Sequence, residues 1–466
     1  MVFSSFSFLL IFFPAVCLCY FLVPGRFRSA RNLVLLAFSL FFYFWGEAKG
    51  VLLMLAVIAV SFGSALLMGD TTTERWRRRL GLWLELLVCL GVLVYFKYTG
   101  LLVRTVNSLL VLDLKVPEIV MPIGISFFTF QSMSYVFDVY RGKVPPQRNP
   151  LHVALYVALF PQLVAGPIVR YETVAEEITN RRETPEDVYE GLQRFIMGFG
   201  KKLLLANAFG REAEEIFAMS PAQRGTPAAW LGVALYGLQI YFDFSAYSDM
   251  AIGMGRMFGF HFPENFNYPY TARSVSEFWR RWHMSLSTWF RDYIYIPLGG
   301  NRKGLARQLL NVFIVWALTG LWHGASWNYV LWGVYFGILL MLEKLFLGKL
   351  LQKLPRAVGH LYTLLAVTLA WTLFYFTDMN QVAQYLTELF RFQGSFNHVL
   401  LTLRQNVPEL VFGLALCTSL PMRLFRMSAG KPWAELLRCL WLLGVLALSV
   451  LALTGSSFNA FIYFRF

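Results

Sequence analysis

The stretch VLLMLAVIAVSFGSALLM, residues 51–68, runs for eighteen residues without a charged side chain. An α-helix needs about 20 mostly apolar residues to cross the hydrocarbon core of a bilayer, because it rises only about 1.5 Å per residue. Apolar runs of this kind recur along the chain. The sequence therefore predicts an all-α polytopic membrane protein, since a transmembrane β-barrel would show short alternating segments instead.

The composition of the 466 residues agrees with that prediction. Hydrophobic residues make up 57% and charged residues 15%, whereas a soluble chain carries about 25% charged residues. These values exclude a disordered, coiled-coil or disulfide-rich secreted protein. The five cysteines lie in or beside apolar runs and form no CxxC pair. They are typical of small apolar side chains, so we expect neither disulfides nor a metal site.

About 11–12 segments are long and apolar enough to be predicted as spans. They are Phe3 to Val23, 32–45, 50–68, 80–97, 119–140, 191–209, 229–255, 308–321, 326–342, 358–377, 407–422 and 433–454. The apolar stretch 151–168 is interrupted by Pro161 and Pro167, which favours a re-entrant segment. No stretch is long enough for a separate soluble core, so we expect one membrane domain over residues 1–466.

Positive charge is concentrated in the loops between alternate spans. The net charge is +14, and most of the 41 lysines and arginines lie in seven basic loops, beginning with Arg26, Arg28 and Arg31 after the first span. Basic residues next to spans mark cytoplasmic loops. The alternation places the N terminus outside the cytoplasm, and it accounts for the charge without a nucleic-acid partner.

Several common catalytic signatures are absent from the sequence: GxSxG, HExxH and the Walker A motif. Gly253, Gly255 and Gly259 form a GxGxxxG pattern within an apolar run. Close helix packing explains this pattern better than a dinucleotide-binding loop.

Two of the six histidines each follow a tryptophan in an aromatic context, and the first is His283. Ser274 and Glu277 form a capping box, which predicts a helix start. A stripe at helical spacing follows, made of Val275, Phe278, Trp279, Trp282, Leu286, Trp289 and Phe290. We expect an amphipathic helix at the cytoplasmic interface. His283 lies at the edge of the stripe, either as a functional side chain or as one that satisfies a backbone carbonyl.

The second histidine, His323, follows Trp322 between two apolar runs. An ionisable side chain at membrane depth is expensive and is a functional candidate by default. Gly320 and Gly324 would let a substrate approach closely, and histidine exchanges protons near neutral pH. The alternative is a structural histidine that is hydrogen-bonded between helices.

Polar side chains also interrupt other apolar segments. Gln131 lies in the run that ends near residue 140, and Asp243 and Ser245 lie in YFDFSAYSDMAIG. With Trp322 and Gly324 they are candidates to line an aqueous tunnel, or they hydrogen-bond one helix to another.

An ordered set of motifs resembles the membrane-bound O-acyltransferase family. The motifs are PIGISFFTFQSMSYVFDVYRG (122–142), FPQLVAGPIVRY (160–171), YFDFSAYSDMAIGMGRMFG (241–259), FWRRWHMSLSTWFRDYIYIPLGGNRKG (278–304), LTGLWHGASW (318–327) and FIYFRF (461–466). Within the family the chain is most similar to the bacterial alginate O-acetylation branch, and more distantly to the teichoic acid D-alanylation branch. The resemblance covers essentially the whole chain, with a motif-rich acyltransferase core at about 119–346.

This resemblance implies an O-acyltransferase of the bacterial plasma membrane, a helical bundle around a narrow tunnel. It carries the catalytic histidine over to His323 in the WHG motif and the second characteristic position to His283. It also implies a cytoplasmic acetyl-CoA donor and an exopolysaccharide outside the cytoplasm. The acetyl group would pass through an extracytoplasmic partner, either an SGNH-type acetyltransferase or a polysaccharide-synthesis complex.

The residues and the resemblance together give a mechanistic hypothesis. Acetyl-CoA would be a donor substrate, with no permanently bound cofactor. Its phosphates would lie near Arg280, Arg281, Arg291, Arg302 or Lys303. His323 would take the proton of an acceptor hydroxyl as it attacks the thioester.

Two alternatives remain open at this stage. One is D-alanyl or lipid O-acyl transfer within the same family. The other is a transporter or flippase for an acylated lipid or sugar, which polar residues within spans also fit.

Overall fold

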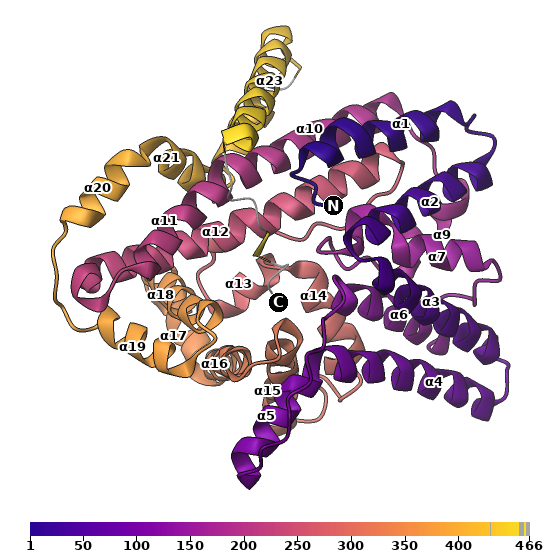
Figure 1. The fold of residues 1–466 in the computed structure, drawn as a ribbon, viewed down its shortest axis with the longest axis horizontal. Coiled ribbons are helices and arrows are strands. Elements are labelled where there is room, and N and C mark those ends of the chain that lie inside the picture. Colours follow the sequence, from indigo (N-terminus) through magenta and orange to yellow (C-terminus); the bar gives the residue numbers. More distant parts are fainter. Residues whose placement is uncertain (429, 456–460, 463–466) are drawn as a thin grey trace. The chain divides into compact units, whose positions relative to one another are not determined.

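The computed structural model describes residues 1–428, 430–455 and 461–462. All regular secondary structure in these residues is helical (Figure 1), which confirms the predicted all-α class. The chain forms two compact units. Unit 1 comprises residues 1–195 and 248–263, and unit 2 comprises residues 196–247 and 264–466. The boundaries fall within two helices, so α10 and α12 each contribute to both units.

Unit 1 contains the helices of the first part of the chain, with η marking π- and 3₁₀-helical segments. They are η1 (Ser7–Phe12), α1 (Phe13–Leu22), α2 (Arg28–Gly46), α3 (Ala48–Met68), α4 (Arg75–Leu93), η2 (Val94–Tyr98), α5 (Thr99–Leu110), α6 (Ile125–Tyr140), α7 (Pro150–Ala158), α8 (Phe160–Leu163), α9 (Tyr171–Asn180) and the start of α10 (Pro185–Gly200). Helix α3 packs against both α4 and α6. A Cβ at Gly81 of α4 would lie 2.7 Å from the Ser64 carbonyl oxygen of α3, so this packing depends on a glycine.

Unit 2 contains the remaining helices and the two Trp-His pairs. Its elements are η3 (Lys201–Ala206), α11 (Asn207–Ala218), α12 (Pro221–Met257, shared with unit 1), η4 (Pro269–Thr271), α13 (Val275–Arg281), α14 (Met284–Phe290), η5 (Arg291–Tyr295), α15 (Leu305–His323), α16 (Trp327–Leu342), η6 (Glu343–Leu347), α17 (Gly348–Lys353), α18 (Arg356–Tyr375), α19 (Met379–Leu389), α20 (Asn397–Gln405), α21 (Val407–Leu416), α22 (Leu420–Ser428) and α23 (Pro432–Gly455).

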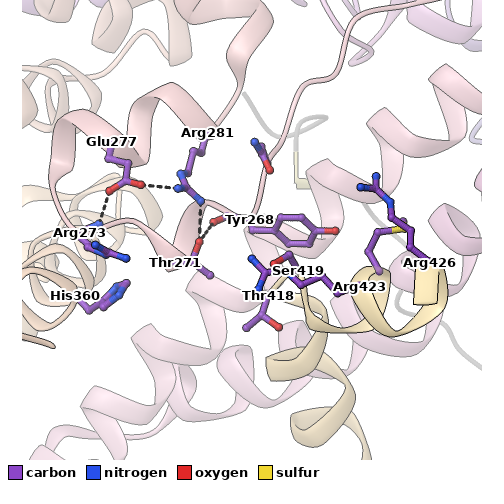
Figure 2. Close-up of a pocket in the computed structure, with 12 residues that line it drawn as sticks. Tyr268, Thr271, Arg273, Glu277, Arg281, His360, Thr418, Ser419, Arg423 and Arg426 are labelled. Atoms are coloured by element: carbon purple, nitrogen blue, oxygen red, sulfur yellow. Dashed lines mark hydrogen bonds and ion pairs between the residues drawn. The ribbon is translucent and has the colours of Figure 1, made fainter. Parts of the chain in front are cut away.

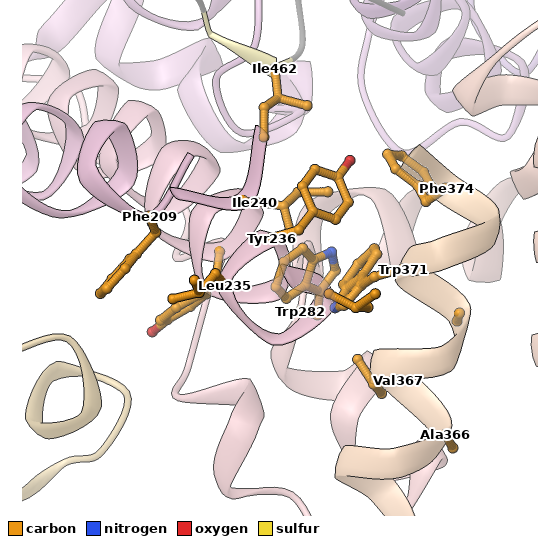
Figure 3. Close-up of a cluster of buried hydrophobic side chains, with 14 of the residues drawn as sticks. Phe209, Leu235, Tyr236, Ile240, Trp282, Ala366, Val367, Trp371, Phe374 and Ile462 are labelled. Carbon is orange, nitrogen blue, oxygen red and sulfur yellow. The ribbon is translucent and has the colours of Figure 1, made fainter. Parts of the chain in front are cut away.

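Aromatic side chains dominate the core of unit 2. Trp282, Trp332 and Trp371 are at most 2% exposed and come from three separate parts of the chain. Figure 3 shows Trp282 and Trp371 facing one another between the helix that carries Tyr236 and Ile240 and the helix that carries Phe374. This rigid ring cluster holds the segments on which both Trp-His pairs lie.

Seven described helical segments are long and apolar enough to cross a membrane, and a bent pair raises the number to eight. The seven are Arg28–Gly46, Ala48–Met68, Arg75–Leu110, Leu305–His323, Trp327–Lys353, Arg356–Tyr375 and Pro432–Gly455; the pair is α20 with α21, bent by 76°. Some of the other predicted spans are helices that are too short to cross the hydrocarbon core. The first is a helix of Ser7–Leu22, and α6 has 16 residues, which at 1.5 Å per residue is shorter than the hydrocarbon core.

Two local predictions can be compared directly with the structure. The proline-interrupted stretch 151–168 forms two short helices, α7 and α8, which are separated at Leu159, where ψ is 113°. At Gly253 of α12 an added Cβ would lie 2.5 Å from the Gly191 carbonyl oxygen of α10. The expectation of close helix packing is confirmed for Gly253, whereas Gly255 faces the Phe262 ring and Gly259 lies beyond the end of α12 with φ +78°.

Candidate active site

His323 is the last residue of α15 and is 5% exposed. The helix ends there because Gly324 takes an extended conformation, with φ −170° and ψ 154°. Three aromatic rings surround the imidazole edge-on. The ring centroids of Trp322 and Trp332 lie 4.9 Å away, and that of Phe374 lies 5.2 Å away. The side chain is therefore buried within an aromatic shell that packs against it on three sides.

Glycines allow α15 and α16 to approach closely beside His323. A Cβ at Gly320 would lie 2.3 Å from the Tyr329 carbonyl oxygen, and one at Gly324 would lie 2.2 Å from the Tyr329 ring. Gly333 of α16 meets the Trp316 carbonyl oxygen in the same way, at 2.3 Å. The space beside Gly320 and Gly324 is thus occupied by Tyr329, and their role in admitting a substrate stays a prediction.

His283 occupies the break between α13 and α14. The predicted helix start is confirmed, because the Glu277 amide donates to Ser274 Oγ at 3.0 Å; the Glu277 carboxylate accepts from the Arg273 backbone N–H at 2.9 Å, one residue before the Ser274 position of a capping box. The expected continuous amphipathic helix is wrong: α13 ends at Arg281, and His283 has φ +44° and ψ 54°. Periodicity could not reveal the break, since the stripe continues on both sides of it. A left-handed conformation at a histidine is uncommon and strained, and it aims the side chain inward, where it is 1% exposed.

Asn265 determines which nitrogen of His283 carries the proton. His283 Nδ1 lies 3.1 Å from Asn265 Oδ1, which also accepts the Ser285 backbone N–H at 3.2 Å. Because a backbone N–H can only donate, the shared atom must be the amide oxygen. His283 therefore donates through Nδ1, and its lone pair lies on Nε2.

The chemical environment keeps His283 uncharged. Burial lowers the pKa of its imidazole well below the ordinary value of 6.5, and the nearby His323 imidazole lowers it further. At neutral pH the side chain is a neutral base of fixed tautomer.

The two Trp-His pairs meet in unit 2. Trp322 lies between the two imidazoles, with its ring centroid 5.9 Å from that of His283 and 4.9 Å from that of His323. Phe244 closes the other side of His283 at 4.6 Å. His283 and His323 are 40 residues apart in the sequence, yet their side chains lie in one buried centre.

The three polar candidates for a tunnel lining have different surroundings. Asp243 is buried and forms an ion pair with Lys202 at 2.6 Å, and its other oxygen accepts the Ile462 backbone N–H at 2.7 Å. Ser245 is also buried in unit 2, whereas Gln131 is buried in unit 1. The alternative of structural polar contacts fits Asp243 best. The motif at 461–466 is described only at Phe461 and Ile462; residues 463–466 lie outside the described residues.

The five basic residues predicted for donor phosphates differ in their surroundings. Arg281 lines a polar cavity, where it pairs with Glu277. Arg291 pairs with the neighbouring Asp292. Arg280, Arg302 and Lys303 are exposed at the surface.

A second cavity lies close to the histidine centre. It has a volume of about 420 Å³ and is lined by Tyr329 among other residues. The Tyr329 ring packs on Phe374 at 5.2 Å, and Phe374 in turn packs on His323. Aromatic and amide side chains share its lining: Phe217, Tyr236, Gln239, Tyr375, Phe376 and Gln381. Rings that stack on sugar faces and amides that bind hydroxyls suit a polar organic acceptor.

Sequence reasoning missed three residues of the centre: Asn265, Trp332 and Phe374. Asn265 lies 18 residues before His283, and only the paired backbone of 265–267 with 281–284 brings them together. No local pattern marks such a contact. Within the described part of the chain no group of three or more His, Cys, Asp or Glu could hold a metal ion.

The fold and the site together define a multi-pass membrane protein with a buried two-histidine centre in an aromatic shell. The family follows from comparison with known sequences. Residues 40–377 match the model of MBOAT, the membrane-bound O-acyltransferase family, and the chain belongs to that family. It is therefore an O-acyltransferase embedded in a lipid bilayer.

Three relatives illustrate what the chain is similar to. The probable alginate O-acetylase AlgI of Pseudomonas putida is 37% identical over the full length of both chains. The peptidoglycan O-acetyltransferase of Helicobacter pylori is 32% identical over 80% of this chain and 77% of its own. The teichoic acid D-alanyltransferase of Bacillus subtilis is 31% identical over 47% of this chain and 58% of its own. The expected order of resemblance, with the alginate branch ahead of the D-alanylation branch, is confirmed.

Proposed function

We propose that this protein transfers an acetyl group from cytoplasmic acetyl-CoA across the plasma membrane for O-acetylation of an extracytoplasmic polysaccharide. The observation that carries the proposal is the buried pair of His283 and His323 in one aromatic centre. Relatives named as O-acetylases match most or all of the chain. An alginate-like polymer or another exopolysaccharide is the acceptor class.

His323 acts as the general base in this proposal. Its imidazole takes the proton of the acceptor hydroxyl while the hydroxyl oxygen bonds to the thioester carbonyl carbon. The carbon–sulfur bond then breaks, and the imidazolium returns the proton to the CoA thiolate. General-base catalysis of this kind contributes about 10²–10⁴-fold. The surrounding rings of Trp322, Trp332 and Phe374 exclude water and so protect the thioester from hydrolysis.

His283 positions a reactant. Asn265 fixes its tautomer, so Nε2 is available to accept a hydrogen bond from the acceptor or from the donor amide. The neutral state supports this role, because a protonated imidazole could not accept.

The donor and the partner are the finer parts of the proposal. Acetyl-CoA would approach from the cytoplasmic face, with its phosphates near Arg280, Arg281, Arg291, Arg302 or Lys303. The cavity beside Tyr329 would admit the acceptor. An extracytoplasmic SGNH-type acetyltransferase, or a polysaccharide-synthesis complex, would then pass the acetyl group to the polymer.

Two candidates compete with this proposal. D-alanyl or lipid O-acyl transfer keeps the same chemistry but changes the donor, and the D-alanyltransferase relative supports it over only 47% of the chain. A transporter or flippase would perform no chemistry. Buried histidines in a closed aromatic shell favour catalysis over passage.

The test uses membranes that contain the full chain, incubated with acetyl-CoA labelled in the acetyl group. The proposal predicts release of free CoA and appearance of label in an O-ester that mild alkali cleaves. Membranes with His323→Ala serve as the control for background hydrolysis. Absence of donor turnover, with D-alanyl carrier turned over instead, would move the function to D-alanyl transfer; no turnover of any acyl donor would favour transport.

A further inference from the structure

A polar cavity of about 650 Å³ in unit 2 has a strongly basic lining. Arg273 and Arg281 flank α13 on one side, and Arg423 and Arg426 of α22 lie on the other (Figure 2). Glu277 is the one carboxylate among the lining residues. Four guanidinium groups therefore face a single negative charge, so the cavity attracts an anion.

The positive charge that remains available comes from α22. Glu277 pairs with Arg281 at 2.5 Å, and Arg281 also donates to Thr271 Oγ1 at 2.9 Å, so this guanidinium is already engaged. Neither Arg423 nor Arg426 forms a side-chain hydrogen bond or ion pair with the described residues. The two arginines are three residues apart, on one side of α22, and both line this cavity.

Residues near the ends of two candidate membrane segments line this cavity. His360 lies in the second turn of α18, Thr418 follows the end of α21, and α23 is the next helix after α22 in the sequence. The ammonium group of Lys431 lies over the Trp433 ring at 5.7 Å, at the start of α23. Tryptophan and lysine at the end of a span mark the boundary between water and lipid. The cavity is thus lined by residues that are close in sequence to the ends of candidate spans, which is where lipid headgroups are expected.

Helix α22 presents an apolar face as well as a basic one. Leu420, Leu424 and Met427, at helical spacing, are 56%, 58% and 78% exposed. An amphipathic helix of this kind lies in the headgroup region with its apolar side chains among the acyl chains. A ligand that reaches the cavity along α22 thus meets apolar side chains on one side and arginines on the other.

We propose that this cavity binds the phosphate group of an anionic membrane lipid, with Arg423 and Arg426 as its principal contacts. Basic pockets between membrane helices recognise anionic headgroups in this way. The exposed apolar face beside the arginines favours a lipid over a soluble phosphate. Arg281 is shared with the residues proposed for the donor phosphates, whereas Arg423 and Arg426 are not, so variants of these two arginines test the lipid site separately from acyl transfer.

The test measures binding of fluorescent phosphatidylglycerol to the purified full chain in neutral detergent micelles. Each basic side chain near an anionic surface contributes about a factor of five to affinity, so Arg423→Gln/Arg426→Gln should weaken binding about thirtyfold. The double lysine variant should retain most of the affinity. Arg404→Gln, an exposed arginine of α20 outside the cavity, should change it less than twofold. Phosphatidylcholine should bind weakly to the wild type.

Three results would overturn the proposal: equal affinity of the wild type and the double glutamine variant, equal affinity for phosphatidylcholine, or displacement of the lipid by micromolar adenosine 3′,5′-bisphosphate. The last result would assign the cavity to a soluble phosphate ligand. If the double variant fails to fold, the affinity of the wild type for phosphatidylglycerol is measured at sodium chloride concentrations from about 50 to 500 mM. The proposal predicts that this affinity falls as the salt rises, and an unchanged affinity would overturn it.

Discussion

His283 combines three unusual properties in one residue: a left-handed backbone, complete burial and a hydrogen bond that fixes its tautomer. The first two oppose folding, because a left-handed histidine backbone is strained and a buried imidazole loses its hydration. Such features persist where the surrounding structure over-determines them, and they concentrate at functional sites. The aromatic cluster around Trp282 provides that support.

The lowered pKa of His283 predicts acid sensitivity. An unfolded histidine titrates near pH 6.5, whereas burial holds the folded pKa well below that value. Between the two values the unfolded state binds a proton that the folded state does not, so stability falls as the pH drops. We expect this group to remove about 1.4 kcal/mol per pH unit below about pH 6.5 and nothing above it. Melting temperatures from pH 8 to 5 measure the effect, and His283→Gln should flatten the acid slope. The same slope in both proteins would contradict it.

Asn265→Asp should reverse the acid sensitivity that comes from His283. A carboxylate facing Nδ1 favours the charged imidazole and raises the pKa of His283. A raised folded pKa contributes stability at low pH that is lost as the pH rises through it. The variant should therefore melt higher relative to wild type at pH 5.5 than at pH 8. Asn265→Leu, which removes the acceptor without adding charge, is the matched control and should be less stable at both pH values.

At the scale of elements, the crossing of α15 and α16 sets the position of His323. An added Cβ at Gly320 would lie 2.3 Å from a carbonyl oxygen, and backbone cannot move aside as a flexible side chain can. We expect Gly320→Ala to destabilise the protein by about 1–3 kcal/mol and to impair activity.

Gly444 of α23 is the matched control, because a Cβ there meets nothing within 4 Å. Gly444→Ala should be neutral or stabilising by up to about 1 kcal/mol, through helix propensity alone. Thermal unfolding in detergent compares the two variants. If the two alanine variants change the melting temperature equally, the close crossing of α15 and α16 is not the reason for a glycine at position 320.

The ion pair of Lys202 and Asp243 joins η3 to α12 and, through Ile462, to the end of the described chain. Removing one partner leaves a buried charge alone, which costs about 3–5 kcal/mol. We expect Lys202→Met and Asp243→Leu each to destabilise strongly, and the double variant to lose much less than the two losses combined. Strictly additive losses in the melting cycle would show that the pair is not coupled.

The elements show what sequence patterns can and cannot determine. Helices such as α3 and α16 follow from uninterrupted apolar runs, because the bilayer acts on each segment locally. The break at His283 depends on Asn265 and on the backbone pairing around it, which are non-local. The histidines and the start of α13 could therefore be predicted, whereas the tautomer-fixing partner could not.

At the scale of the whole molecule, the arrangement of basic loops predicts an N terminus outside the cytoplasm. In a cysteine-free background, Lys49→Cys and Thr72→Cys place single thiols at exposed positions, the first in the first turn of α3 and the second beyond its C-terminal end. A membrane-impermeant maleimide added to intact cells should label residue 49, and should label residue 72 only after permeabilisation. The opposite pattern would invert the predicted orientation.

The central claim is that this chain catalyses acetyl transfer with His323 as the base. The most direct measurement is the turnover number of the purified protein with acetyl-CoA, for wild type and His323→Gln, alongside the dissociation constant for CoA. The account predicts a fall of about 10²–10⁴-fold in turnover with CoA binding and melting temperature nearly unchanged. Wild-type turnover by a folded His323→Gln variant would contradict it.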